Sequence, residues 1–173
     1  MTKHIPTASI VATPFAGAME FRLAMRELAS AVSIITAGQG KKRRGLTVTA
    51  LCSLSVEPPS LIVCVNKATE GHKAILQHGS FCVNVLAAEH RLFADSFAGR
   101  TGRRGIERFS EGEWTSLVTG APVLAGAIAV LDCEIINFLD HGTHTVFIGA
   151  VRAARSEPNR RALVYRAGDY QGV

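Results

Sequence analysis

The chain alternates short apolar, β-branched runs with turn residues, and this pattern limits the folds that it can adopt. No repeated strand–helix–strand unit is present, so a doubly wound parallel sheet is disfavoured. The runs lie close together in the sequence, and strands predominate over helices. We therefore predict a single mainly β domain, an antiparallel barrel with short covering helices. The predicted strands cover residues 33–36, 45–55, 61–65, 81–86, 127–138 and 144–155.

One helix is predicted near the start of the chain. Phe21, Met25, Leu28 and Val32 recur at helical spacing, and the charged side chains lie mainly off that stripe. A helix with one apolar stripe usually buries it against another element. We expect this helix to cover a sheet.

Two further helices are predicted between the strands. Thr69 is a candidate N-cap for a helix that runs to about residue 77. Residues 88–98 form a second short helix, and Gly99 directly after it is a natural C-cap.

Three features shape the predicted strands. Residues 45–55 carry no charge and alternate hydroxyl with apolar side chains, which predicts one strand with a face toward something polar. Pro58 and Pro59 interrupt the pattern, because proline cannot donate to a sheet ladder. Near the end of the chain, His141 and Gly142 supply a turn between two long strands, so a long hairpin is expected there.

Length and composition fit one folded domain. The chain has 173 residues, of which 47% are hydrophobic and 19% are charged. Its longest apolar stretches, residues 61–65 and 127–131, are far shorter than the roughly 20 residues that span a bilayer. Residues 1–19 lack a continuous signal-peptide core and are interpreted as a loose arm, so that the domain occupies residues 20–173.

The cysteines and histidines do not predict a metal site. Cys52, Cys64, Cys82 and Cys133 are widely spaced without a C-x-x-C pair, which favours reduced thiols in a cytoplasmic protein over structural zinc. The H-x-x-H spacing at positions 141 and 144 lies near a turn, where it does not converge ligands as it would on a helix.

Two short segments are rich in basic residues. Residues 41–44 read KKRR between two glycines and supply four of the five net positive charges. A solvated hairpin tip is one interpretation, and a local anion site, for example for a dinucleotide phosphate, is the other. Residues 100–105 read RTGRRG and are interpreted as a mobile loop. Basic residues spread along one face are absent, which argues against nucleic-acid binding.

Two polar clusters could bind a ligand, and no hydrolytic motif or Rossmann fingerprint competes with them. Hydroxyls and backbone amides follow the strand over residues 45–55. Asn66, Lys67 and Thr69 place an amide, a cation and a hydroxyl where a strand meets a helix N-terminus, an arrangement that suits a phosphate. A capped helix beside a half-exposed strand explains the same residues without a ligand. His144 is either an ordinary strand histidine or a ligand contact.

At these residues the chain resembles the short-chain flavin reductases of two-component monooxygenases, such as the 4-hydroxyphenylacetate 3-monooxygenase reductases. The resemblance runs through FRLAMRELASAVSIIT, GLTVTALCSLSVEPPSLIVCVNKAT, SFCVNVLAAEHRLFADSFAG and HTVFIGAV. It implies an FMN-binding split β-barrel with Greek-key character and a homodimer with flavin near the subunit interface.

The resemblance also implies roles for individual residues. His144 would position the nicotinamide, and Tyr170 would lie near the same face. Phe97 and Gly99 would close the wall of the flavin site. The remaining flavin-binding residues implied are Thr47, Val48, Thr49, Ala50 and Ser53 for the ring and ribityl chain, Asn66, Lys67 and Thr69 for the phosphate end, and Asn84, Val85 and Leu86 beside the ring system.

The implied activity is reduction of FMN or FAD by hydride transfer from NADH or NADPH, which needs no catalytic triad because the chemistry belongs to the cofactors. Reduced flavin would then diffuse to a partner monooxygenase. One alternative is an enzyme with prosthetic FMN that reduces another acceptor, such as a ferric chelate or a corrin cobalt. A non-catalytic flavin-binding module is another. No membrane or nucleic-acid partner is expected.

Overall fold

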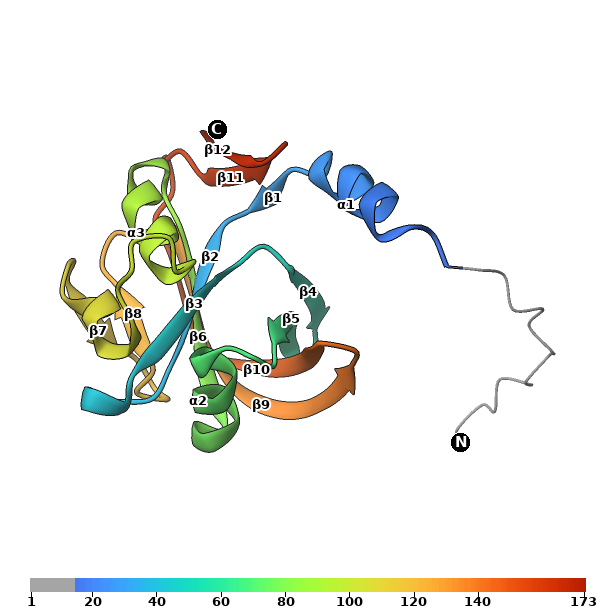
Figure 1. Cartoon of the computed structure of the whole chain (residues 1–173). Coiled ribbons are helices and arrows are strands. Elements are labelled where there is room, and N and C mark those ends of the chain that lie inside the picture. The colour runs from blue at the N-terminus through green and yellow to red at the C-terminus, as the bar shows by residue number, and fades with distance from the viewer. Residues whose placement is uncertain (1–14) are drawn as a thin grey trace, which may run out of the picture.

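The computed structural model describes residues 15–173, which form a split β-barrel with a few short helices in one domain (Figure 1). The α-helices are α1 (Ala18–Arg26), α2 (Glu70–His78) and α3 (Arg91–Phe97), with 3₁₀ turns at η1 (Gly40–Lys42), η2 (Ala88–His90) and η3 (Gly105–Phe109). The strands are β1 (Ser30–Ala31), β2 (Ser33–Ala37), β3 (Arg44–Val48), β4 (Leu51–Val56), β5 (Pro59–Asn66), β6 (Ser80–Val85), β7 (Trp114–Ser116), β8 (Pro122–Leu124), β9 (Ala129–His141), β10 (His144–Ser156), β11 (Leu163–Arg166) and β12 (Asp169–Gly172).

The main sheet has seven antiparallel strands in the order β3-β2-β6-β9-β10-β5-β4. Its two edges, β3 and β4, are consecutive in the chain, so the sheet curls round until the edges approach each other (Figure 1). Thr49 and Ala50 make the crossing between these edges. The prediction of one strand over residues 45–55 is therefore wrong, because the chain leaves one edge of the sheet there and joins the other.

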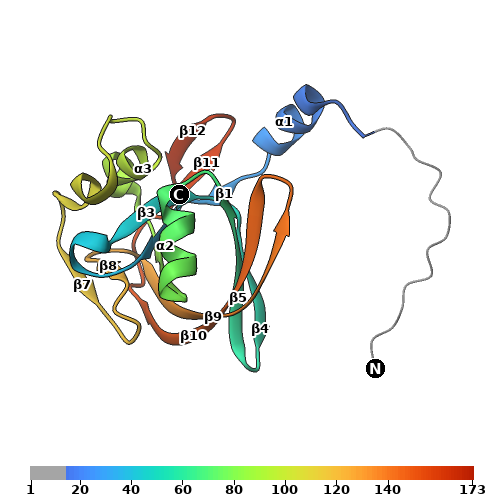
Figure 2. The same cartoon turned by 60° about the horizontal axis from the view of Figure 1, so that its bottom comes forward.

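The central strands are buried on both faces, which explains their apolar sequences. Ile35, Phe81 and Phe147 belong to a core inside the barrel, which α2 covers with Ala74 and Ile75. The second core lies on the other face of β2 and β6, under α3 and the β7–β8 and β11–β12 hairpins (Figures 1 and 2). It is formed by Val32, Ile34, Cys82, Leu86, Ala94, Phe97, Phe109, Ala121, Val123, Leu124, Ala127, Val130, Leu163 and Tyr170.

Several sequence predictions are confirmed. Thr69 caps α2, whose His72 N–H donates to the Thr69 hydroxyl at 3.1 Å. Gly99 follows α3 with φ of 81°, a conformation that favours glycine. The long hairpin is β9–β10, with its turn at Gly142 and Thr143. Pro59 begins β5 rather than interrupting it, at the strand-start position that proline tolerates.

The predicted covering role of the first helix is wrong. Helix α1 ends at Arg26, before Leu28 and Val32, and none of its residues is buried. It projects from the barrel, where Arg26 exchanges backbone and side-chain hydrogen bonds with Ala167 (Figure 2). The apolar side of α1 therefore has no partner among residues 15–173. Of the predicted arm, residues 1–14 lie outside the described residues, and Ala18 already begins the helix.

The sequence patterns gave no signal for β1, β7, β8, β11 or β12, which are two to four residues long. Among residues 15–173, no helix is long and apolar enough to cross a membrane.

Candidate functional site

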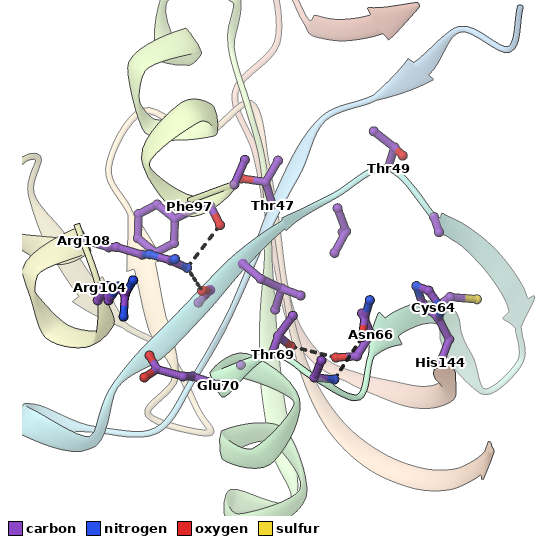
Figure 3. A pocket seen from close by; sticks show the side chains of 17 residues that line it. Thr47, Thr49, Cys64, Asn66, Thr69, Glu70, Phe97, Arg104, Arg108 and His144 are labelled. Atoms are coloured by element: carbon purple, nitrogen blue, oxygen red, sulfur yellow. Dashed lines mark hydrogen bonds between the residues drawn. The ribbon is translucent and has the colours of Figure 1, made fainter. Parts of the chain in front are cut away.

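A cavity of about 560 Å³ lies beside the edge strand β3, between the N-terminus of α2 and the end of α3 (Figure 3). The ends of β5 and β10 close its other side. Its lining residues are Gly45, Leu46, Thr47, Val48, Thr49, Ala50, Cys64, Asn66, Ala68, Thr69, Glu70, Gly71, Phe97, Ala98, Arg104, Arg108 and His144. Eight of the predicted site residues are thus brought together: Thr47, Val48, Thr49, Ala50, Asn66, Thr69, Phe97 and His144.

The N-terminus of α2 presents free backbone donors to the cavity. Thr69 donates to the Asn66 carbonyl through its N–H and its hydroxyl, at 3.1 and 2.8 Å, and the Asn66 side chain accepts from the Ala68 N–H at 2.9 Å. These bonds fix the turn. The N–H groups of Glu70 and Gly71, the first two helical residues, have no intrahelical acceptor. Together with the helix dipole they form a site that favours an anion.

Glycines allow both helices to approach β3 closely. A Cβ atom on Gly71 would lie 2.5 Å from the Leu46 side chain, and one on Gly45 would lie 2.6 Å from the Phe97 ring. A larger residue at either position would force the Leu46 or the Phe97 side chain, both of which line the cavity, to shift.

Two arginines that sequence reasoning missed also line the cavity. Arg108 has a structural role, because its guanidinium donates to the carbonyls of Gly45, Phe97 and Arg103, each at 3.2 Å. The Arg104 guanidinium has no hydrogen bond or ion pair among residues 15–173, so it is available to a ligand. The signal was present in the RTGRRG segment, which the sequence analysis interpreted only as a loop.

Lys67, the predicted phosphate-binding cation, does not line the cavity. Its Nζ lies 3.9 Å from an Asp140 carboxylate oxygen on the β9–β10 hairpin. Register explains the difference. Asn66 at the end of β5 pairs with His144, and the following residue hydrogen-bonds to the Thr143 carbonyl and turns toward the hairpin.

The hydroxyl-rich segment contributes mainly its backbone. The Thr47 hydroxyl donates to the Ala94 carbonyl at 2.7 Å and thereby ties β3 to α3. Because β3 is an edge strand, its backbone groups that face away from β2 have no strand partner. Thr49 and Ala50 are exposed at the mouth. Ser53 lies along the exposed part of β4, opposite Leu61, and is outside the lining.

Asn84, Val85 and Leu86, which the resemblance places beside the flavin ring system, do not line this cavity. Asn84 is completely buried, where its amide donates to carbonyls of Ile34 and Pro122 and accepts from the Leu124 N–H at 2.7 Å. Leu86 is a core residue, and the Val85 carbonyl accepts from the N–H of residue 128. Gly99 lies just beyond the lining residue Ala98 and shapes the end of α3.

His144 and Tyr170 occupy different places. His144 begins β10, opposite His141 on β9, and is half-buried in the cavity wall beside Cys64 (Figure 3). Its Nδ1 lies 2.9 Å from the Thr143 hydroxyl. Tyr170 is only 7% exposed and lines a smaller adjoining pocket of about 220 Å³, which shares the backbone of residues 47–49 with the main cavity.

A hydrogen-bond network of His72, Thr145 and Asp140 lies next to the part of the cavity wall that His144 forms. Thr145 donates its hydroxyl proton to Asp140, so the same oxygen accepts from Nε2 of His72 at 2.8 Å. Nε2 of His72 therefore carries a proton. Burial lowers its pKa, and Lys67 lowers it further, while Asp140 opposes the shift. This hydrogen-bond network joins α2 to the β9–β10 hairpin, which carries His144.

No group of three His, Cys, Asp or Glu side chains within residues 15–173 is arranged to hold a metal ion. The site combines anion-binding donors at one end with an imidazole at the other.

The family model for the flavin reductase like domain matches residues 25–173. This chain belongs to the flavin reductase-like family. It is 42% identical over 154 residues to the protein named FMN reductase (NADH) RutF 2 of Methylorubrum extorquens, covering 89% of this chain and 88% of that relative. The family membership makes this chain a flavin reductase.

Solved structures of the same fold agree. BorF, the flavin reductase component of a bacterial two-component tryptophan halogenase, aligns with a TM-score of 0.83 at 32% identity, covering 91% of this flavin reductase and 98% of BorF. The Streptomyces globisporus NADH:FAD oxidoreductase SgcE6, in complex with NAD and FAD fragments, aligns with a TM-score of 0.80 at 29% identity, covering 88% and 90% of the two chains.

The buried His72 predicts a pH dependence of stability. Because burial lowers its pKa in the folded state, the unfolded chain binds a proton more readily. The contribution is fully present above the unfolded pKa of about 6.5 and is lost as the pH falls below it. His72→Gln keeps an amide donor for Thr145 but cannot titrate. As the pH is lowered, the unfolding free energy of this variant should therefore fall less steeply than that of the wild type. Denaturant unfolding at about pH 7.5 and about pH 5.5 measures this.

His90, whose pKa burial also lowers, contributes equally to the wild type and the His72→Gln variant. Identical declines in the two proteins would exclude His72 as the source.

Proposed function

We propose that this flavin reductase uses NADH to reduce FMN in the cavity beside β3. The observation that carries the proposal is the pairing of an anion site, at α2 and Arg104, with a half-buried histidine at the far side of the same cavity. The name of the Methylorubrum relative, FMN reductase (NADH), supports the choice of both substrates. Titration with NADH under argon tests it, because the visible absorbance of bound FMN should be lost.

The residues of the cavity suit FMN. The free N–H groups of Glu70 and Gly71 and the guanidinium of Arg104 would hold the phosphate, and the unpaired edge of β3 would donate to ring carbonyls. When bound, the flavin supplies an electron-accepting ring that takes a hydride from reduced nicotinamide. The protein orients the two reactants and excludes water, so no side chain has to transfer a proton at this step.

The phosphate assignment predicts unequal effects of two basic residues. Arg104→Gln should weaken FMN binding about tenfold, because a charge-assisted contact contributes roughly 1.5–3 kcal/mol. Riboflavin, which lacks the phosphate, should bind both proteins equally. Lys67→Gln is the matched control and should change FMN affinity less than about twofold, because Lys67 faces Asp140 and does not line the cavity. Calorimetry that finds the larger loss in Lys67→Gln would reverse the assignment.

His144 is proposed to position the nicotinamide. Its ring lies at the cavity wall, so His144→Ala should lower kcat/KM for NADH about five- to a hundredfold, a loss of roughly 1–3 kcal/mol. FMN affinity should stay nearly constant. His141→Ala is the control, because His141 pairs with His144 across the hairpin but is exposed outside the cavity.

Stopped-flow reduction and a melting curve separate this role from a structural one. A purely structural His144 would lower the melting temperature of the variant and leave the kinetics of the folded enzyme intact. Wild-type reduction rates at every NADH concentration would remove His144 from the site.

We also propose that this flavin reductase is a homodimer. Apolar side chains are exposed along one side of α1, including Phe21 at 61% and Met25 at 47%, and on the outer strands, including Val56 at 84% and Phe138 at 52%. Such surfaces in a folded protein favour association. An isologous interface would cover them on both copies.

Light scattering tests the dimer. The wild type should have twice the 18.4 kDa mass of the chain. Phe21→Ser combined with Met25→Ser should shift it toward monomer, whereas Leu92→Ser, which changes an exposed apolar residue on α3, should not. A monomeric wild type that still binds FMN would contradict the proposal.

Reduced flavin is proposed to leave the open cavity and serve a flavin-dependent monooxygenase. The description of BorF as a component of a two-component system supports such a division of labour. The four free cysteines fit a reducing cytoplasmic location for this flavin reductase. Gel filtration discriminates a prosthetic FMN, which would stay with the protein, from a diffusible one.

A further inference from the structure

Another pocket, of about 340 Å³, lies between the turn that joins β2 to β3 and the β7–β8 hairpin (Figure 2). None of its lining residues lines the flavin cavity. We call it the hairpin pocket, and it is lined by Gly38, Gln39, Gly40, Arg43, Trp114, Thr115, Ser116, Gly120 and Pro122. The hydride transfer proposed above uses none of these side chains.

Buried polar contacts fix the walls of the hairpin pocket. The side-chain amide of Gln39 donates to the Thr119 carbonyl at 3.3 Å and so links the β2–β3 turn to the β7–β8 hairpin. The carboxylate of Asp132, which is completely buried, accepts from the N–H of Thr119 at 2.8 Å and from its hydroxyl. The Pro122 carbonyl accepts from the buried hydroxyl of Thr36. The pocket is therefore formed before a ligand arrives, which lowers the entropy lost on binding.

Arg43 gives the hairpin pocket an unpaired positive charge. Its guanidinium has no ion pair or hydrogen bond among residues 15–173, and its Nε is buried without an acceptor. The guanidinium carbon lies 4.8 Å from the centroid of the Phe109 ring, a cation–π contact that holds the side chain in place. No lining residue is acidic, and Lys41 and Lys42 follow closely in the same turn. The pocket therefore favours an anion.

The opposite wall combines an aromatic ring with hydroxyl groups. Trp114 is half-buried, and its orientation is fixed because its indole N–H donates to the Glu111 carbonyl at 2.8 Å and its ring packs 4.8 Å from that of Phe109. The hydroxyls of Thr115 and Ser116 are exposed and make no side-chain hydrogen bond within residues 15–173. A ligand would thus meet a cation, two free hydroxyls and one flat apolar surface.

We propose that the hairpin pocket binds a small organic carboxylate with a flat ring, whose carboxyl group pairs with Arg43 and whose ring packs against Trp114. The fork of a guanidinium matches a carboxylate through two parallel N–H···O bonds, and a hydroxyl can donate to the same group. Aromatic rings pack favourably on an indole. The proposal gives one residue of the KKRR segment a role in ligand binding outside the flavin cavity.

Trp114 is the single tryptophan of the chain, so its indole N–H reports on this pocket alone. Benzoate is the probe, added to the full-length protein with and without saturating FMN. It should shift the indole peak in a proton–nitrogen correlation spectrum, with the same dissociation constant in both cases because the two pockets share no lining residue. Benzamide, which lacks the charge, and acetate, which lacks the ring, should each bind about tenfold more weakly or worse.

Variants of the basic segment test the role of Arg43. Arg43→Gln should raise the dissociation constant for benzoate about tenfold or more, and Arg43→Lys should cause a smaller loss, because an ammonium keeps the charge without the fork. Lys41→Gln is the matched control. It removes one positive charge from the same turn, but Lys41 does not line the pocket, so the affinity for benzoate should be kept. Melting curves check that each variant is folded.

Several results would overturn the site. An indole peak that does not move with benzoate would do so, as would equal losses of affinity in Arg43→Gln and Lys41→Gln. Equal binding of benzamide would exclude recognition of the carboxylate, and equal binding of acetate would exclude recognition of the ring. Loss of the benzoate response on addition of FMN would place benzoate in the flavin cavity instead.

Discussion

The unpaired edge of β3 is the constraint on which the rest of this structure depends. The sheet curls so far that its two edge strands are joined by Thr49 and Ala50 alone, yet β3 and β4 never pair. An open edge would normally invite another strand. Here α2 and α3 cover part of it, and the glycines at positions 45 and 71 let them approach closely. What remains uncovered is a row of backbone groups beside a cavity, so the proposed binding site lies at the split in the barrel.

The cavity side chains that the sequence marks as polar are mostly engaged by the protein itself. Thr47 is bonded to α3, and Asn66 and Thr69 are bonded to each other and to the backbone of the α2 turn. These bonds fix the turn and leave the helix N–H groups free. In the proposed site, the backbone and Arg104 are the groups that would bind an anion. A site of this kind is rigid before a ligand arrives, which reduces the entropy lost on binding.

Local signals in the sequence were sufficient for most elements. The Thr69 cap, the Gly99 C-cap and the long hairpin depend on residues within a few positions of each other, and each prediction is confirmed. The errors arise where distant segments decide. Nothing near Asn84 indicates that its amide will be satisfied by Pro122 and Leu124, about forty residues away. The stripe on α1 was also real, but no surface within residues 15–173 covers it.

The cations near the cavity show the same limit in electrostatics. Lys67 directly follows β5, and its charge beside a helix N-terminus predicts a phosphate contact. The chain turns there, and the Lys67 ammonium lies 3.9 Å from Asp140 on the β9–β10 hairpin instead of lining the cavity. Arg104 lies some forty residues later in a segment without regular structure, yet η3 and the three bonds of Arg108 bring that segment back to β3. Charge sign and helix dipole could be anticipated from the sequence. The identity of the cation that meets them depends on how a loop folds back, and that is fixed by backbone carbonyls rather than by any side-chain pattern.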